Sequence, residues 1–230
     1  MVVVSVLSGG LDSTILLHSI KKDMKYDVLA LSFNYGQRHV YELEKAKETC
    51  AELEVPHKII NIDFFGDIVA PVSSLSAGDK VAVPTIEEVL GHPQPSTYVP
   101  FRNLMLTSIA LAFAESNNAK GVYLGLQSHD LYSYWDTSPQ FVDIMNDLTL
   151  LNRMHSIPLV APFVHMSKKE EIEIGVRLGV DFTRTWTCYA GPNEKGEACG
   201  VCPSCAERIG NFKYAGVKDP IPYAISIDWT

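Results

Sequence analysis

The sequence has no surplus of basic charge and no long apolar run. Its 19 lysines and arginines stand against 27 aspartates and glutamates, a formal net charge of −8. Because phosphate neutralisation dominates the affinity of nucleic-acid binders, this balance argues against a large DNA or RNA footprint and suits a small-molecule substrate. No apolar stretch is long enough to cross a bilayer, and the apolar residues 1–7 are too short for a signal peptide. We therefore expect a cytoplasmic protein with no membrane or DNA partner.

No internal repeat or low-complexity tract interrupts the chain, which alternates strand and helix patterns instead. Apolar, β-branched runs at residues 2–7, 28–33 and 58–62 predict buried parallel strands. The amphipathic stretches 11–22 and 39–53 between them predict helices. Strand–helix–strand repetition with short links predicts a doubly wound α/β fold, a parallel sheet with helices on both faces.

The second half resumes this pattern after a proline-rich interruption at residues 63–100, which indicates a long functional loop or lid, or a partly disordered segment. Residues 103–116 predict a helix that is apolar nearly all round and therefore central, and a strand at 122–125 and a helix at 139–151 follow. A capping box at residues 167–170 opens another helix, which Gly179 closes. We expect residues 1–180 to form the α/β domain, with loop 63–100 inserted, and residues 181–230 to form a separate segment.

The first strand runs into the hexapeptide Ser8-Gly9-Gly10-Leu11-Asp12-Ser13. The glycines let the backbone approach an anion and point N–H groups at it, and the helix behind adds its positive dipole end. Asp12 makes sense beside phosphate mainly as a partner of Mg²⁺. The loop lacks the ending of a Walker loop and the spacing of a dinucleotide fingerprint. We expect these six residues to bind the pyrophosphate of ATP rather than form a plain glycine-rich turn.

Four of the five cysteines crowd into one stretch near the C-terminus: Cys188, Cys199, Cys202 and Cys205. In a chain without a secretion signal, such crowding indicates metal ligation rather than disulfides. Four thiolates at tetrahedral positions leave no open coordination site, so we predict a structural Zn²⁺. An iron–sulfur cluster is the competing interpretation, and four reduced thiols without metal are the third.

The two motifs together resemble the QueC family, the 7-cyano-7-deazaguanine synthases of the PP-loop ATP pyrophosphatase superfamily. Residues 8–14, 35–39 with Glu42, 73–75, 99–103 and 187–205 carry the resemblance, which extends over nearly the whole chain. It implies a doubly wound sheet of the PP-loop (HUP) type with a small zinc-binding helical segment, usually as a homodimer. It also implies cleavage of ATP between the α and β phosphates.

The substrate implied by this family is 7-carboxy-7-deazaguanine. One ATP adenylates its carboxylate, ammonia gives the amide, and a second ATP activates the amide so that loss of AMP leaves the nitrile. A carboxylate accepts no amine until its oxygen becomes a leaving group, and fixed cations and N–H groups should meet the charge that develops. We therefore expect a C–N ligase that forms AMP and pyrophosphate, uses ATP and Mg²⁺, and takes ammonia or another amine.

Further candidate site residues lie at strand ends and helix starts. We assign catalysis to Asp12, Ser13 and Arg102, because a guanidinium can form two parallel hydrogen bonds to a phosphate or carboxylate. Phe33 joins the ATP-binding set, although strand aromatics are generally core. The substrate-binding set, placed by the carboxyl edge of the sheet and the resemblance, is Tyr35, Gln37, Arg102, Asn103, Asp130 and Asp136. Simple packing is the alternative for Tyr35, and helix capping is the alternative for Asn103.

One stretch departs from the family pattern. Residues 132–141 read YSYWDTSPQF where the family usually carries SGYPDCRPEF, so Thr137, Ser138 and Gln140 replace a cysteine, an arginine and an acid. Phe101 also replaces a residue that is usually small. Loss of the arginine removes a fixed charge. Either the loop of a synthase is rebuilt, or the enzyme stops at the amide or couples the carboxylate to another amine. QueC-like proteins of anti-phage defence (CBASS) operons would use a protein acceptor in that way.

A tRNA-binding modification protein is the alternative from another class, because the superfamily includes tRNA thiolases. The acidic balance opposes it. A thiolase also needs a reactive thiol, and the fifth cysteine, Cys50, falls in a predicted helix.

Overall fold

The computed structural model describes residues 1–37, 40–76, 82–89, 95–128 and 134–229. In this part of the chain five parallel strands form one sheet in the order β3-β2-β1-β4-β5. Their bounds are β1 Val2–Val6, β2 Asp27–Asn34, β3 His57–Asn61, β4 Val122–Tyr123 and β5 Leu159–Val160. The parallel sheet expected from the sequence is therefore confirmed.

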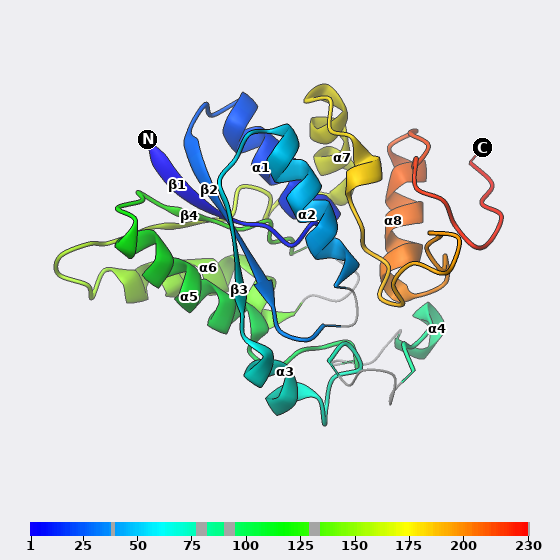
Figure 1. Cartoon of the computed structure of the whole chain (residues 1–230), viewed down its shortest axis with the longest axis horizontal. Coiled ribbons are helices and arrows are strands. Elements are labelled where there is room, and N and C mark those ends of the chain that lie inside the picture. Colours follow the sequence, from blue (N-terminus) through cyan, green and yellow to red (C-terminus); the bar gives the residue numbers. More distant parts are fainter. Residues whose placement is uncertain (38–39, 77–81, 90–94, 129–133, 230) are drawn as a thin grey trace.

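Helices cover both faces of the sheet (Figure 1). The helices α1 (Leu11–Lys22), α2 (Tyr41–Glu52) and α7 (Lys168–Arg177) pack on one face, and α5 (Arg102–Ser116) and α6 (Pro139–Thr149) on the other. Successive side chains of a strand point to opposite faces, so Val3 joins the first core and Val4 the second. This arrangement confirms the doubly wound α/β fold.

The sheet places a ligand crevice beside β1. This strand pairs with β2 on one side and with β4 on the other, although β4 follows β3 in the chain. The connections therefore diverge at β1 and β4, and ligands of such sheets bind outside the carboxyl ends at this point. Residues 7–13 and 124–127 leave the sheet there.

The region 63–100 is not a loop throughout. It holds α3 (Asp63–Val69) and the short α4 (Ile86–Val89), while residues 77–81 and 90–94 lie outside the described part. Helix α3 forms because Phe65 and Val69 bury their side chains in the core of the α5 face.

Helix α5 is not central either. The buried residues of α5 are Thr107, Ala110 and Ala114, and apolar residues such as Leu104 and Leu111 are only half-buried. The helix belongs to an outer layer that covers the sheet from one side. Among the described residues no helix has the length and apolar character needed to span a bilayer.

The helix at residues 168–177 has the expected ends. The Ser167 side chain accepts from the Glu170 N–H, and the Glu170 carboxylate accepts from the Ser167 N–H at 2.7 Å, which is the predicted capping box. Gly179 follows the helix with φ +66°.

The C-terminal segment contains the 3₁₀ turn η3 (Phe182–Arg184) and the helix α8 (Pro203–Tyr214). Phe182 and Phe212 contact edge to face and lie in the same core as α1 and α7. Within the segment, Arg208 and Asp219 form a buried ion pair, with Nε and Oδ2 2.6 Å apart. A domain boundary near residue 180 stays a prediction, since the segment shares this core with the sheet.

Candidate active site

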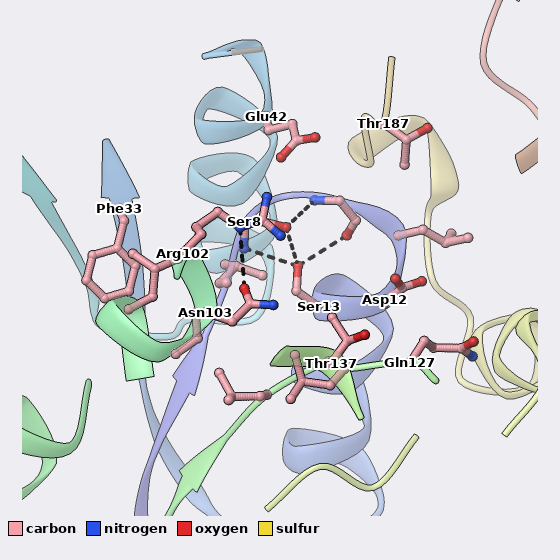
Figure 2. A pocket seen from close by; sticks show the side chains of 18 of the residues that line it. Ser8, Asp12, Ser13, Phe33, Glu42, Arg102, Asn103, Gln127, Thr137 and Thr187 are labelled. Carbon is pink, nitrogen blue, oxygen red and sulfur yellow. Dashed lines mark hydrogen bonds between the residues drawn. The ribbon is translucent and has the colours of Figure 1, made fainter. Parts of the chain in front are cut away.

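A cavity of about 280 Å³ lies at the carboxyl ends of β1, β2 and β4 (Figure 2). One part of its wall is apolar: Val6, Leu7, Phe33, Leu106, Leu124 and Leu126. The polar part includes Ser8, Asp12, Ser13, Gln37, Glu42, Arg102, Asn103, Gln127, Thr137, Thr187 and Ser204. An apolar wall with convergent polar groups is the usual character of a small-molecule site.

The predicted ATP loop forms one side of this cavity. Ser8 Oγ and Ser13 Oγ lie 3.0 Å apart, the Ser8 N–H donates to Ser13 Oγ at 3.1 Å, and the Gly10 N–H donates to Ser8 Oγ at 3.0 Å. Helix α1 starts at Leu11, and no side chain caps it. Because the first N–H groups of a helix lack partners within the helix, this end is suited to bind an anion.

Gly9 stands behind the cavity wall and fixes the position of α2. Its φ is +89°, and a Cβ built on it would lie 1.9 Å from the backbone oxygen of Glu42. The Gly9 carbonyl also accepts from the Trp186 N–H at 3.0 Å. Only a residue without a side chain lets α2 and the C-terminal segment approach the loop this closely.

Asp12 has a partner that the sequence did not reveal. Lys168 Nζ, from the first turn of α7, lies 2.8 Å from Asp12 Oδ2, and the lysine side chain is only 9 % exposed. Asp12 Oδ1 is buried, and burial, then the charge of Asp12 and a side-chain hydrogen bond between the two carboxyl groups, raise the pKa of Glu171 well above the usual range. A carboxylate at this point of the loop is suited to the Mg²⁺ that accompanies ATP.

Arg102 is the one cationic side chain among the described residues that line the cavity. It is the first residue of α5 and follows Phe101, which has the left-handed backbone φ of 54°. Burial lowers its pKa, but Tyr35 and Asp136 outweigh burial, so the net shift is upward and the guanidinium stays charged. A fixed positive charge therefore lies in the cavity that the predicted ATP loop also lines.

The other predicted substrate residues differ in their placement. Asn103 does not cap α5; its N–H donates to Asp136 Oδ2 at 3.1 Å and its side-chain Nδ2 donates to the Asp136 carbonyl at 3.2 Å. Asn103 lines the cavity, whereas Asp136 is 3 % exposed and lies behind the described wall, where it joins η2 (Trp135–Thr137) to α5. Burial raises the pKa of Asp136. Asp130 lies outside the described residues.

The residues at the end of β2 both pack and line the site. Phe33 and Tyr35 are each 5 % exposed, belong to the core of the α5 face, and form cavity wall. Gln37 Oε1 accepts from the Tyr35 N–H at 2.8 Å, and its Nε2 donates to the Phe33 carbonyl at 3.1 Å. Gln37 thus holds the backbone turn that presents Tyr35.

The residues that depart from the family pattern do not place a charge in the cavity. Thr137 lines it, Ser138 caps α6 by accepting from the Phe141 N–H at 3.1 Å, and Gln140 is exposed. Phe101 contacts Trp135 edge to face, with ring centroids 5.3 Å apart. Two departures 34 positions apart therefore meet in space.

Sequence reasoning also missed several wall residues. Glu42, Gln127, Thr187, Tyr189 and Ser204 all line the cavity. All of these except Gln127 lie in stretches that carried the family resemblance, which is the one signal that could have identified them. Gln127 comes from a segment whose approach depends on tertiary structure.

The four clustered cysteines converge as predicted. Their sulfurs all lie within 4.8 Å of one another, and Cys199 Sγ is 3.8 Å from Cys205 Sγ. A tetrahedral ion with bonds of about 2.3 Å places its sulfurs about 3.8 Å apart. The donor set therefore fits one metal ion, and a cluster of several irons would hold its thiolates further apart.

Comparison with known proteins identifies the family. A family model described as "Queuosine biosynthesis protein QueC" matches residues 2–216. The 7-cyano-7-deazaguanine synthase of Caldicellulosiruptor bescii is 44% identical over 228 residues, covering 98% of this chain and 99% of the relative. That of Caldicellulosiruptor saccharolyticus is 42% identical over 226 residues, covering 98% and 97%. The chain belongs to the QueC family.

Solved structures are more distant from this QueC-family protein. The NH3-dependent NAD synthetase from Campylobacter jejuni has a TM-score of 0.48 and 18% identity, covering 80% of this chain and 66% of the synthetase. The U34-tRNA thiolase NcsA from Methanococcus maripaludis has a TM-score of 0.49 and 16% identity, covering 79% and 58%. At these values the likeness carries no argument about function, so the family rests on the sequence relatives.

Proposed function

We propose that this QueC-family protein is an ATP-dependent ligase that adenylates 7-carboxy-7-deazaguanine and joins its carboxyl carbon to ammonia. The product is 7-cyano-7-deazaguanine, reached through the amide. The observation that carries the proposal is one cavity that joins an uncapped helix N-terminus, the hydroxyls of Ser8 and Ser13, and the charged Arg102. Relatives named 7-cyano-7-deazaguanine synthase over 98% of the chain support the substrate.

In the first step a substrate carboxylate oxygen attacks the α phosphorus of ATP and pyrophosphate leaves. The N–H groups at the start of α1 and the hydroxyls of Ser8 and Ser13 hold the departing phosphates. The Asp12 carboxylate, which lines the cavity, would hold Mg²⁺, which neutralises phosphate charge when bound. Arg102 faces the reacting oxygens, and the apolar wall near Phe33 and Leu106 accepts a flat purine-like ring.

In the second step ammonia attacks the acyl carbon. The C–N bond forms, the C–O bond to AMP breaks, and a proton is lost with formation of the amide. A second ATP then adenylates the amide oxygen, and loss of AMP and protons leaves the nitrile. In both adenylation steps the negative charge develops on the phosphates of ATP and on the oxygen of the same substrate carbon, so one fixed cation and one anion-binding loop serve both steps.

Coupling of the deazaguanine carboxylate to a protein amine is the second candidate. Ser138 and Gln140 favour it, because neither supplies the charge that the family pattern has in this loop. A tRNA thiolase is opposed by Cys50, which is 3 % exposed and whose pKa burial raises to about 12.

We also propose a structural Zn²⁺ at the four cysteines, a cytoplasmic location and a homodimer. The exposed apolar side chains Ile144, Leu148 and Leu151 offer a dimer surface along α6 and the residues after it. Sedimentation of Leu148→Glu/Leu151→Glu should show a monomer if this surface forms the dimer.

The decisive experiment incubates the protein with ATP, Mg²⁺, ammonium and 7-carboxy-7-deazaguanine, and follows AMP, amide and nitrile by chromatography. AMP with nitrile supports the synthase, and AMP with amide alone supports the second candidate or an enzyme that stops early. Arg102→Lys keeps the positive charge but loses the two parallel hydrogen bonds that a guanidinium can donate, and we expect this variant to slow AMP release. Absence of AMP from the unmodified protein would contradict the proposal.

A further inference from the structure

Glu42 is fixed against the ATP loop by its backbone. It is the second residue of α2, and its carbonyl occupies the place where a side chain on Gly9 would begin. Its side chain lines the cavity, and Figure 2 shows it reaching in from α2 on the side of Thr187. A shift of α2 away from the site would therefore have to move the loop as well.

Several charged or titratable groups face Glu42 from the surrounding elements: Arg102 from α5, Asp12 from α1, Tyr35 after β2 and Cys188 from the C-terminal segment. Burial raises the pKa of Glu42 well above its usual range; Arg102 opposes this, and Asp12 and Cys188 add to it. Glu44, two residues further along the same helix, is exposed and pairs with Lys47 at 2.8 Å. The two glutamates of α2 therefore have opposite environments.

The proposed reaction needs a proton acceptor at this cavity. Ammonia in neutral solution is mainly ammonium, which has no lone pair and cannot attack a carbonyl. Asp12 and Glu42 are the carboxylates among the described wall residues, and Asp12 is held by Lys168 at 2.8 Å. Glu42 and Arg102 line the same cavity, and the charge of Arg102 acts on the Glu42 carboxyl group.

We propose that Glu42 is a further catalytic residue, the base that converts ammonium into the attacking ammonia. This inference rests on the proposed function. In its ionised form, which the charge of Arg102 favours, Glu42 attracts ammonium and removes one proton, giving ammonia and the carboxylic acid. Ammonia attacks the acyl-adenylate, the C–N bond forms and AMP leaves with its oxygen. The second proton goes to water as the amide forms, and Glu42 returns its own proton to water before the next turnover.

The test separates adenylation from amine attack in Glu42→Gln, with Glu44→Gln as the matched control on the same helix. Exchange of labelled pyrophosphate into ATP, with 7-carboxy-7-deazaguanine but no amine, measures adenylation alone. Amide formation is then measured with ammonium, and hydroxamate formation with hydroxylamine, which is largely neutral at pH 7. General-base catalysis typically contributes about 10²–10⁴-fold.

We expect Glu42→Gln to keep exchange near the level of the unmodified protein and to lose amide formation from ammonium by about 10²-fold or more. Hydroxylamine should restore most of the lost rate, and Glu44→Gln should change neither activity. If Glu42→Gln does not fold, Glu42→Asp should likewise keep pyrophosphate exchange and lose amide formation, because aspartate keeps the charge but withdraws it by one methylene.

Two results would overturn the assignment. Equal loss of exchange and amide formation would make Glu42 a structural support of the loop, and an unchanged amide rate with ammonium would show that no base is needed there. Absence of exchange in the unmodified protein is a different failure, since it would remove the proposed function itself together with the reaction that the base serves.

Discussion

Two arginine–aspartate pairs of this protein have similar geometry and opposite burial, which makes the cost of burial measurable. Arg208 contacts Asp219 through Nε at 2.6 Å and Nη2 at 2.9 Å, with side chains 1% and 0% exposed. Arg177 contacts Asp23 through Nη1 at 3.0 Å and Nη2 at 2.7 Å, with side chains 57% and 40% exposed. Both pairs are bidentate, and Arg208 also donates from Nη1 to Thr185 Oγ1 at 2.9 Å, so a variant at Arg208 loses a hydrogen bond outside the pair as well.

The expected magnitudes differ several-fold. Arg208→Met leaves Asp219 buried without its cation, and loss of one partner of a buried pair costs about 3–5 kcal/mol. An exposed pair is screened by water and contributes little, so Arg177→Met should cost far less. For a chain of this length each kcal/mol lowers Tm by about 2–4 °C. We therefore expect Tm to fall by about 6–20 °C in Arg208→Met and by much less in Arg177→Met.

The assay is thermal unfolding of both variants with metal content held equal, repeated in urea to obtain free energies. Arg208 lies in the same helix as Cys205, and Asp219 also accepts from the Tyr223 hydroxyl at 2.7 Å, so Arg208→Met should release metal to a chelator sooner. Equal Tm shifts in the two variants would refute the reasoning. A double variant Arg208→Met/Asp219→Leu that recovers part of the stability would show that the unpaired carboxylate, not the missing arginine, is the main cost.

Three further sets of variants and one treatment test other parts of the structure. Gly9→Ala should abolish the exchange of pyrophosphate into ATP, since its Cβ would lie 1.9 Å from a backbone oxygen. Gly191 also has a positive φ, +75°, but open space around it, so Gly191→Ala should lower stability by about 1 kcal/mol and leave the exchange activity unchanged. Burial and two nearby cations lower the pKa of His18 from 6.5 to about 4, so the imidazole is neutral in the folded protein. Because the unfolded chain binds the extra proton, the free energy of unfolding should fall by roughly 3 kcal/mol between pH 6.5 and about pH 4. Urea titrations of His18→Gln should not show this loss. A double-variant cycle of Phe101→Ala and Trp135→Ala should give a coupling of about 0.5–1.5 kcal/mol in unfolding experiments, and additive effects would contradict the ring contact. Chelation should remove one equivalent of zinc by elemental analysis and lower Tm; iron in that analysis, or no metal, would contradict the zinc assignment.

Local patterns were sufficient to predict the core of the fold. The β-branched run at β1 and the 3.6-residue periodicity of α1 are properties of short segments, and both elements formed within a residue of their predicted bounds. Helix α3 was missed because it is only seven residues long, contains Gly66 and gains its stability from tertiary burial of Phe65. The sequence also could not show that α5 would lie in an outer layer, because hydropathy does not say which side of a helix finds a partner.

The candidate site also contains parts that local sequence patterns predict and parts that they do not. The ATP loop and the cysteines are contiguous motifs whose chemistry can be read from residue types and spacing. Lys168 approaches Asp12 across 156 positions, and its own neighbourhood indicated only a helix cap. Asp136 looked like a substrate contact, yet its carboxylate meets the N–H of Asn103 behind the wall. Contacts of this kind depend on how the sheet brings distant segments together, and no local pattern reports them.

The segment that contains the four clustered cysteines is hydrogen-bonded to the predicted ATP loop. The Trp186 N–H donates to the Gly9 carbonyl at 3.0 Å, and two residues further on Cys188 enters the cysteine cluster. Thr187 and Tyr189, on either side of Cys188, both line the cavity. A metal ion that fixes Cys188 would therefore also fix the wall residues beside it and the strand of backbone that supports the loop. A closed metal site in this position would support catalysis through geometry alone, because loss of the metal would free one side of the cavity without removing any proposed catalytic side chain.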